Sequence, residues 1–143
     1  LAPMIEEIFT DLAPLAEKRN ITLEHAGDAT MTGSDALIYR MLFNLTENAV
    51  KYNRPGGSVK VLVCQTEQAL RIRVCDTGCG IPAEYQRSIF QPFFRVDKSR
   101  SREYGGAGLG LSLVWEIADL HGGSVLVEES SEAGSTIAVE LPI

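Results

Sequence analysis

The 143-residue sequence has no uninterrupted apolar run of the roughly 18 residues that a membrane-spanning helix needs. It also has no charged and apolar leader of the kind that directs secretion. These absences exclude a membrane span and a secretory signal within the chain. Because the chain begins at Leu1 rather than Met, we expect a fragment of a larger protein, so neither absence describes the parent.

The chain also has only three cysteines and no excess of basic charge. Cys64, Cys75 and Cys79 form no C-x-x-C pair, which disfavours a metal cluster and favours a reducing compartment. Cys64 and Cys75 alternate with apolar residues, so we expect both thiols in the core. The formal net charge of −6 disfavours nucleic acid as a partner of the whole surface and leaves only a local basic patch open.

The apolar residues that are present indicate a single compact α+β domain. Helical spacing predicts one helix from Met4 to near KRN at 18–20, one from a Ser34 N-cap to about Tyr52 and one from Leu109 to Leu120, with a shorter helix at 83–90. Alternating segments predict strands at 21–26, 58–66, 70–76, 124–129 and 135–142. Since hairpins dominate this order, we expect a mixed sheet with helices on one face.

The loop at 76–85, DTGCGIPAEY, contains the pattern G-x-G-x-x-A that is typical of dinucleotide-binding loops. Here the preceding strand is predicted to be the second arm of a hairpin, and only about eight residues remain for the helix that should follow. Dinucleotide binding is therefore disfavoured, and no lysine follows a glycine as a P-loop requires. Asp76 is either a turn cap or an acceptor on a pocket floor, with glycines that let a ligand approach.

Three further segments carry candidate chemistry. Asn44 and Asn48 lie four residues apart on one helix face, which Lys51 and Tyr52 continue, and an amide oxygen with a lysine suits Mg²⁺ and phosphate. On its own, the aromatic cluster FQPFFR at 90–95 indicates core packing. YGGAGLGL at 104–111 runs glycines into a helix, which favours an anion cradle, a hinge or both.

In this order, the asparagine helix, D-x-G-x-G, F-x-P-F-F and G-x-G-L-G-L resemble the N, first-glycine, F and second-glycine boxes of the ATP-binding domain of sensor histidine kinases. That domain belongs to the Bergerat-fold superfamily, with gyrase, Hsp90 and MutL. HGG at 121–123 and GST at 134–136 extend the resemblance over essentially the whole chain. It implies one ATP-binding catalytic domain over residues 1–143, a two-layer sandwich of about five strands in a mixed sheet with three main helices on one face.

The resemblance also implies a role for individual residues. Those assigned to adenine are Asp76, which accepts from the amino group, and Tyr52, Gly78, Gly80, Ile81 and Thr136 around it. Those assigned to Mg²⁺, phosphate and catalysis are Asn48 as metal ligand, Asn44 beside it, and Lys51. The remaining assignments are the phosphate cradle Gly106, Gly108 and Gly110, the helix anchors Leu109 and Leu111, and Arg95 and Arg102 of a lid at 95–106, in which Lys98 and Arg100 stay open as alternatives.

Asn44 distinguishes the branches of this superfamily. The ATP-hydrolysing relatives carry a glutamate here as general base, and an asparagine cannot take a proton at neutral pH. The resemblance therefore implies a protein-histidine kinase that transfers the γ-phosphoryl group of ATP. A nucleotide-binding or degenerate pseudokinase module that acts through protein contacts, and a Bergerat-fold ATPase, are the alternatives.

The phospho-acceptor is expected outside this chain. His25 and His121 lie in the wrong sequence context, so the resemblance implies an acceptor histidine on a dimerisation domain N-terminal to Leu1. The implied partners are ATP with Mg²⁺, that domain, and a response regulator downstream, with no nucleic acid. We expect a cytoplasmic domain, whose parent can be a membrane sensor.

Overall fold

The computed structural model describes residues 1–31, 33–78, 80–81, 84, 86, 88–91 and 110–142. Among the residues outside these ranges are Cys79 and the predicted site residues Arg95, Arg102, Gly106, Gly108 and Leu109. The elements in chain order are α1 (Ala2–Arg19), β1 (Thr22–Ala26), α2 (Asp35–Lys51), β2 (Ser58–Gln65), β3 (Ala69–Asp76), η2 (Ser88–Phe90), α4 (Gly110–Leu120), β4 (Ser124–Ser131) and β5 (Gly134–Pro142). No helix in the described part is long and apolar enough to cross a bilayer.

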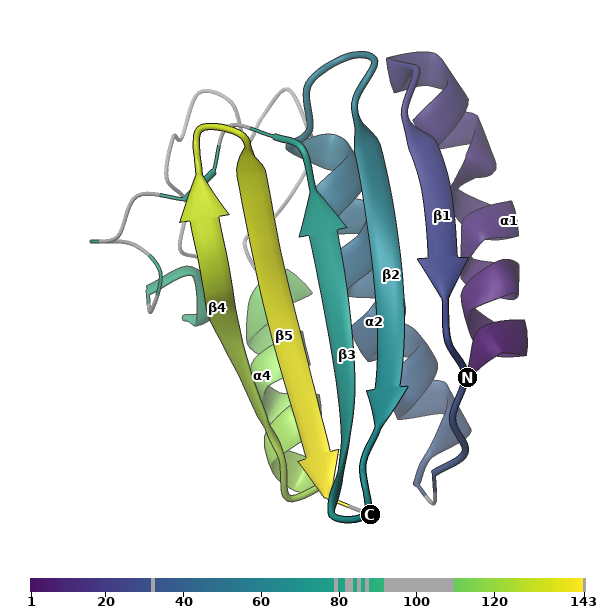
Figure 1. Cartoon of the computed structure of the whole chain (residues 1–143), viewed down its shortest axis with the longest axis vertical. Helices are drawn as coiled ribbons and strands as arrows, with labels where there is room; N and C mark the ends of the chain where they lie inside the picture. The colour runs from purple at the N-terminus through teal and green to yellow at the C-terminus, as the bar shows by residue number, and fades with distance from the viewer. Residues whose placement is uncertain are drawn as a thin grey trace.

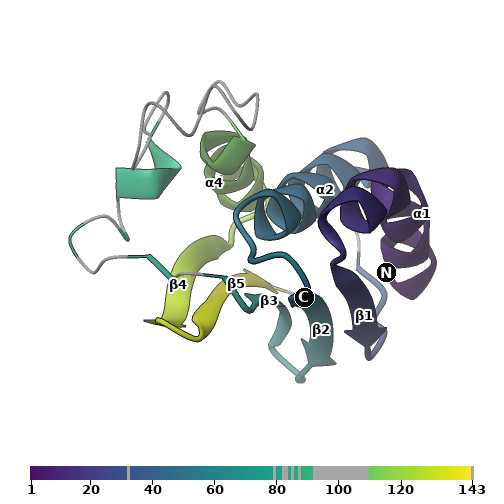
Figure 2. The same cartoon turned by 90° about the horizontal axis from the view of Figure 1, so that it is seen from above.

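The strands form one sheet in the order β1-β2-β3-β5-β4. β1 runs parallel to β2, and the other neighbouring pairs are antiparallel. All three α-helices cover the same face, with α2 lying between α1 and α4 (Figure 2). The predicted α+β sandwich with a mixed sheet is confirmed.

The core lies between this helical layer and the inward face of the sheet. Its strand residues alternate with outward residues, as a pleated sheet with one covered face requires. The most buried members are Val59, Val61, Leu70, Ile72, Val139 and Leu141 from the strands and Ile5, Ile8, Met41, Leu42, Leu45 and Val114 from the helices. Each fully buried aliphatic side chain contributes roughly 1.5–3 kcal/mol to folding before entropy is counted.

Several predicted helix boundaries are found where the sequence signals lie. The Ser34 hydroxyl accepts a hydrogen bond from the Leu37 N–H at 3.3 Å, which caps α2. α4 ends at Leu120, and the φ of +76° at the following Gly122 lets the Gly123 N–H reach back to the Ala118 carbonyl at 2.8 Å. Of the helix predicted at 83–90, the described residues contain the 3₁₀ turn Ser88–Phe90.

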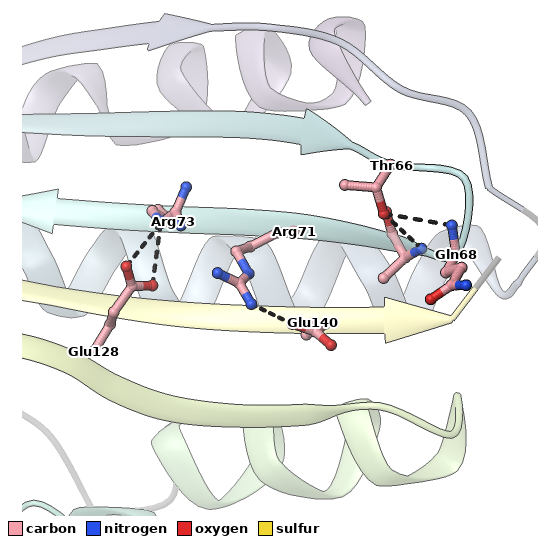
Figure 3. A network of polar contacts seen from close by, with 7 residues as sticks. Thr66, Gln68, Arg71, Arg73, Glu128 and Glu140 are labelled. Atoms are coloured by element: carbon pink, nitrogen blue, oxygen red, sulfur yellow. Dashed lines mark hydrogen bonds and ion pairs between the residues drawn. The ribbon is translucent and has the colours of Figure 1, made fainter.

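The prediction that Cys64 and Cys75 are core thiols is wrong. Cys64 is exposed and Cys75 only half-buried. The valines at 59, 61 and 63 take the inward positions of β2, so the alternation turns Cys64 outward. This outer face is polar instead: Arg71 pairs with Glu140 at 2.5 Å and Arg73 with Glu128 at 3.0 Å, as Figure 3 shows.

His121 joins the end of α4 to the start of α2. Its Nδ1 lies 2.8 Å from the Ile117 carbonyl oxygen, and its Nε2 accepts from the Ser34 N–H at 3.4 Å. Both contacts are satisfied at once by a neutral ring with the proton on Nδ1. A Cβ at position 33 would lie 2.9 Å from the ring, so Gly33 lets the two helix ends approach.

We expect His121→Ala to lower the free energy of unfolding by about 1 kcal/mol, because two hydrogen bonds between helix ends are lost. Urea denaturation measures this change. Leu120→Ala is the matched control, since the Leu120 side chain is 73% exposed and should shift stability by no more than about 0.5 kcal/mol. Equal unfolding midpoints for the two variants would contradict the role of His121 in linking the end of α4 to the start of α2.

Candidate functional site at the carboxyl end of β3

Several of the predicted site residues lie close together at one end of the sheet, namely Tyr52, Asp76, Gly78, Gly80 and Ile81. Figure 1 shows the carboxyl end of β3 and the β4–β5 turn at the same end, next to the end of α2. The Arg54 guanidinium, just after α2, donates to the Glu132 carbonyl in the β4–β5 turn. Segments that are up to 78 residues apart in sequence therefore enclose a common site.

Asp76 is the last residue of β3 and lies on the inward side of the sheet, in phase with Val74 and Ile72. Its Oδ1 accepts from the Gly78 N–H at 2.9 Å. Burial raises the pKa of this carboxyl above its ordinary value of 3.8, and the Gly78 and Ser135 N–H groups oppose that rise. A carboxylate has about four acceptor positions, so these two donors leave capacity for a ligand donor.

The glycines around Asp76 are required by the protein's own backbone contacts. A Cβ at Gly78 would lie 2.6 Å from the Tyr52 carbonyl oxygen. Gly80 has a φ of +80°, and a Cβ there would lie 2.2 Å from the Ser131 carbonyl oxygen. A Cβ at Gly134 would lie 1.9 Å from the Asp76 carbonyl oxygen. The sequence interpretation, that the glycines admit a ligand, stays a prediction, and close backbone packing is a second reason for them.

Ser130 and Ser135 are two site residues that the sequence analysis missed. The Ser130 Oγ accepts from the Ile81 N–H at 2.6 Å and lies 3.1 Å from the Ser135 Oγ. The loop that carries Gly80 and Ile81 is therefore fixed to the β4–β5 hairpin. Serine itself gives no signal of such a role, because only the pairing of β5 with both β3 and β4 brings these hydroxyls beside the loop.

The strand register also separates Thr136 from Asp76. Asp76 pairs with Ser135, whereas Thr136 pairs with Cys75. Since side chains alternate along a strand, Thr136 lies on the outer face with Cys75. Ser135 therefore occupies the position beside Asp76 that the resemblance assigned to Thr136.

Asn44 connects α2 to the first residue of α4. Its side chain is only 8% exposed, and its Nδ2 donates to the Gly110 carbonyl oxygen at 3.2 Å. Asn48 lies one turn further along α2 and is half-buried. Within the described residues, no hydrogen bond is made by the Asn48 side chain. Its amide therefore has no partner among the described residues, one helical turn beyond the Asn44 contact with Gly110.

Lys51 and Tyr52 complete this face at the end of α2. The Lys51 Nζ lies 3.6 Å from the Glu47 carboxylate, and the two residues form an ion pair one helical turn apart. The Tyr52 side chain is 44% exposed, so much of its ring surface remains to be covered. The Tyr52 carbonyl lies next to Gly78, in the loop that follows β3, and the assignment of Lys51 to phosphate stays a prediction.

The donor types at this site suit a nucleotide with a magnesium ion. A Cβ at Gly110 would meet no described atom within 4 Å, so space is open at the start of α4, where the N–H groups favour an anion. Among the described residues, no group of three His, Cys, Asp or Glu side chains could hold a metal. Mg²⁺ is usually bound by one or two protein oxygens together with phosphate and water.

Comparisons with known proteins show which family this chain belongs to. The family described as histidine kinase-, DNA gyrase B- and HSP90-like ATPase matches residues 33–143. Sensor histidine kinase RppB of Synechocystis sp. is 36% identical over 146 residues, a match that covers 100% of this chain and 32% of RppB. The chain therefore belongs to this ATPase family, and membership implies that it binds ATP.

Solved structures agree with this assignment. The catalytic domain of histidine kinase ThkA has a TM-score of 0.83 and 28% identity, with 99% of this chain and 92% of that domain covered. Full-length ShkA in complex with AMPPNP has a TM-score of 0.86 and 26% identity, with 98% of this chain and 29% of ShkA covered. ThkA has also been solved with the response regulator protein TrrA. The chain spans about a third of the length of the curated relatives RppB and CiaH.

The raised pKa of Asp76 makes a prediction about stability and pH. A folded-state pKa above 3.8 means that folding favours the protonated acid, so the free energy of unfolding falls as pH rises through the range above 3.8. Asp76→Asn removes this titration. We expect the variant to be at least as stable as the wild type at pH 7 and to vary less with pH in that range.

Urea denaturation at a series of pH values measures both quantities. Glu132→Gln is the control, because Glu132 is an exposed acid in the neighbouring turn and should leave the pH dependence unchanged. Parallel stability curves for wild type and Asp76→Asn would contradict the burial of a charged Asp76.

Proposed function

We propose that this chain is the ATP-binding catalytic domain of a sensor histidine kinase, which transfers the γ-phosphoryl group of ATP to a histidine on a separate domain. The observation that carries the proposal is the half-buried Asp76 carboxylate, held by main-chain N–H groups at the end of the sheet that lies next to the Tyr52 main chain. A carboxylate in this setting suits a donor such as the adenine amino group. The family membership supports ATP as the ligand.

The binding roles follow from the position of each group. We assign adenine to the space between Asp76 and Tyr52, with Gly78, Gly80, Ile81 and Ser135 around it. Lys51 faces the phosphates, and its present partner Glu47 would compete with them for the ammonium group. The start of α4 at Gly110 offers main-chain N–H groups to the phosphate chain. We also retain Arg95, Arg102, Gly106 and Gly108 as proposed phosphate contacts.

Magnesium would be held by the Asn48 amide oxygen together with phosphate oxygens. When bound, it would offset charge on the transferring phosphoryl group. The Asn44 amide already donates to the Gly110 carbonyl, so its role in this chain is to fix the start of α4 beside Asn48. Hydrolysis is disfavoured because Asn44 cannot accept a proton from water at this position.

Transfer to a histidine needs no base in this domain. A neutral imidazole nitrogen attacks the γ-phosphorus in line, an N–P bond forms, and the bond to the leaving oxygen of ADP breaks. The imidazole then loses its N–H proton to solvent. This domain positions the phosphate chain and stabilises its charge, and the docking of the histidine domain sets the specificity.

We propose that the acceptor histidine lies on a dimerisation domain of the same parent protein. His121 already bridges two helix ends, and the His25 ring packs against Phe9 at a centroid distance of 5.5 Å, so both have structural roles. A response regulator is the proposed downstream partner, supported by the TrrA complex of ThkA. We place the domain in the cytoplasm, where ATP is available.

The transfer reaction is tested with radiolabelled ATP. We expect the parent protein to acquire acid-labile phosphohistidine and this chain alone to acquire none. Asn48→Ala should lower the labelling rate at least about 100-fold, because the magnesium ligand is lost. Gln68→Ala, in the exposed β2–β3 turn, is the matched amide control and should label at the wild-type rate. Steady release of inorganic phosphate by this chain alone, without any phosphoprotein, would favour an ATPase instead.

A further inference from the structure

Asn53 lies just outside the residues that the resemblance assigns to the site, and yet it is only 5% exposed. Its Nδ2 donates to the Ser58 carbonyl at 2.8 Å. Its Oδ1 accepts from the Arg54 N–H at 2.8 Å and from the Thr77 hydroxyl at 3.0 Å. A buried amide with three such hydrogen bonds is costly to disturb.

The Thr77 hydroxyl is the second side-chain group of this hydrogen-bond network. Its Oγ1 donates to Asn53 and accepts from the Ser58 N–H at 2.9 Å. A Cβ at Gly57 would lie 2.4 Å from the Thr77 Oγ1 and 2.5 Å from the Asn53 Oδ1, so a larger residue there would displace the pair. The hydroxyl is therefore both a donor and an acceptor within a closely packed turn.

The position of this pair in the chain relates it to the nucleotide site. Asn53 directly follows Tyr52, and Thr77 directly follows Asp76. The main chains also touch, because a Cβ at Gly78 would lie 2.6 Å from the Tyr52 carbonyl and 3.4 Å from the Asn53 Cα. The Asn53–Thr77 hydrogen bond thus joins the two segments that carry the proposed adenine contacts.

Arg19 extends the network to the last turn of α1. Its Nη2 donates to the Asn53 carbonyl oxygen at 2.6 Å. Its own carbonyl accepts from the Gly56 N–H at 3.3 Å, and the Thr22 N–H donates to the Gly57 carbonyl at 3.1 Å. Arg19 precedes the segment 33–143 that the family matches, so this support comes from outside the family's shared core.

We propose that Asn53 and Thr77 are a positioning pair that fixes the separation of Tyr52 and the Asp76 carboxylate, and that this separation sets the preference of the site for a 6-amino purine. Arg19 supports the pair from α1. The proposal rests on the proposed ATP site. Neither Asn53 nor Thr77 touches the ligand in this account, so their effect is transmitted through the residues next to them.

A merely structural role makes a different prediction from a positioning role. If the network only stabilises the turn, its loss lowers stability and leaves the affinities of the folded protein unchanged. If it positions Asp76, its loss weakens the contact with the amino group and leaves phosphate binding intact. Purine riboside triphosphate, which lacks the 6-amino group, separates these two effects.

The experiment measures dissociation constants for ATP and for purine riboside triphosphate by calorimetry. Thr77→Val keeps the side-chain shape and removes the hydroxyl. We expect it to weaken ATP binding at least about fivefold and analogue binding less than about twofold, so the preference for ATP falls. Thr77→Ser restores the hydroxyl and should restore the preference.

Thr66→Val is the matched control. The Thr66 hydroxyl also has both roles, since it donates to the Ala69 carbonyl and accepts from the Ala69 N–H, each at 3.1 Å, but it lies at the opposite end of the β2–β3 pair (Figure 3). The Thr66→Val variant should prefer ATP over the analogue to the same extent as the wild type. Arg19→Met, which keeps an apolar stem, carries the test if Thr77→Val does not fold, and it should lower the preference in the same direction.

The outcomes separate this inference from the proposed function. A wild-type chain that is folded and binds neither nucleotide overturns the proposed function and this inference together. A wild type that prefers ATP, with the same preference retained in Thr77→Val and Arg19→Met, overturns the positioning pair alone. A loss of preference in Thr77→Val that Thr77→Ser restores supports it.

Discussion

The antiparallel pairing of β3 with β5 is the constraint on which the site depends. It places Ser135 opposite Asp76 and brings Gly134 against the Asp76 main chain. The carboxylate is half-buried at the strand end with main-chain donors already in place. A shift of one residue in this register would turn Thr136 inward and replace the whole inward set of β5. The register of β3 with β5 therefore determines both the hydrophobic core and the proposed nucleotide site.

The helical layer completes the site through polar contacts rather than through apolar packing alone. Asn44 fixes the start of α4 to α2, and His121 fixes the end of α4 to the start of α2. These two contacts hold α4 near both of its ends. The Asn48 side chain makes no hydrogen bond among the described residues, which is consistent with its proposed role as a magnesium ligand. Asn44, which cannot act as a general base, has a positional function at the start of α4.

The sequence predicts the parts of this structure that local chemistry determines. The Ser34 cap, the glycine end of α4, the β2–β3 hairpin and the asparagine face of α2 all follow from spacing and residue type. Residues whose roles depend on register were not predictable in this way. The outward phase of Cys64, the exchange of Ser135 for Thr136, and the Asn53–Thr77 bond between residues 24 positions apart need the paired strands to be known.

Calorimetric titration of ATP into the wild type and Asp76→Asn shows whether the Asp76 carboxylate takes part in binding adenine. We expect saturable binding to the wild type and a loss of affinity of at least about tenfold in Asp76→Asn, with both proteins folded. Equal affinities would mean that the half-buried carboxylate has no part in nucleotide recognition, and the proposed adenine contact would be wrong.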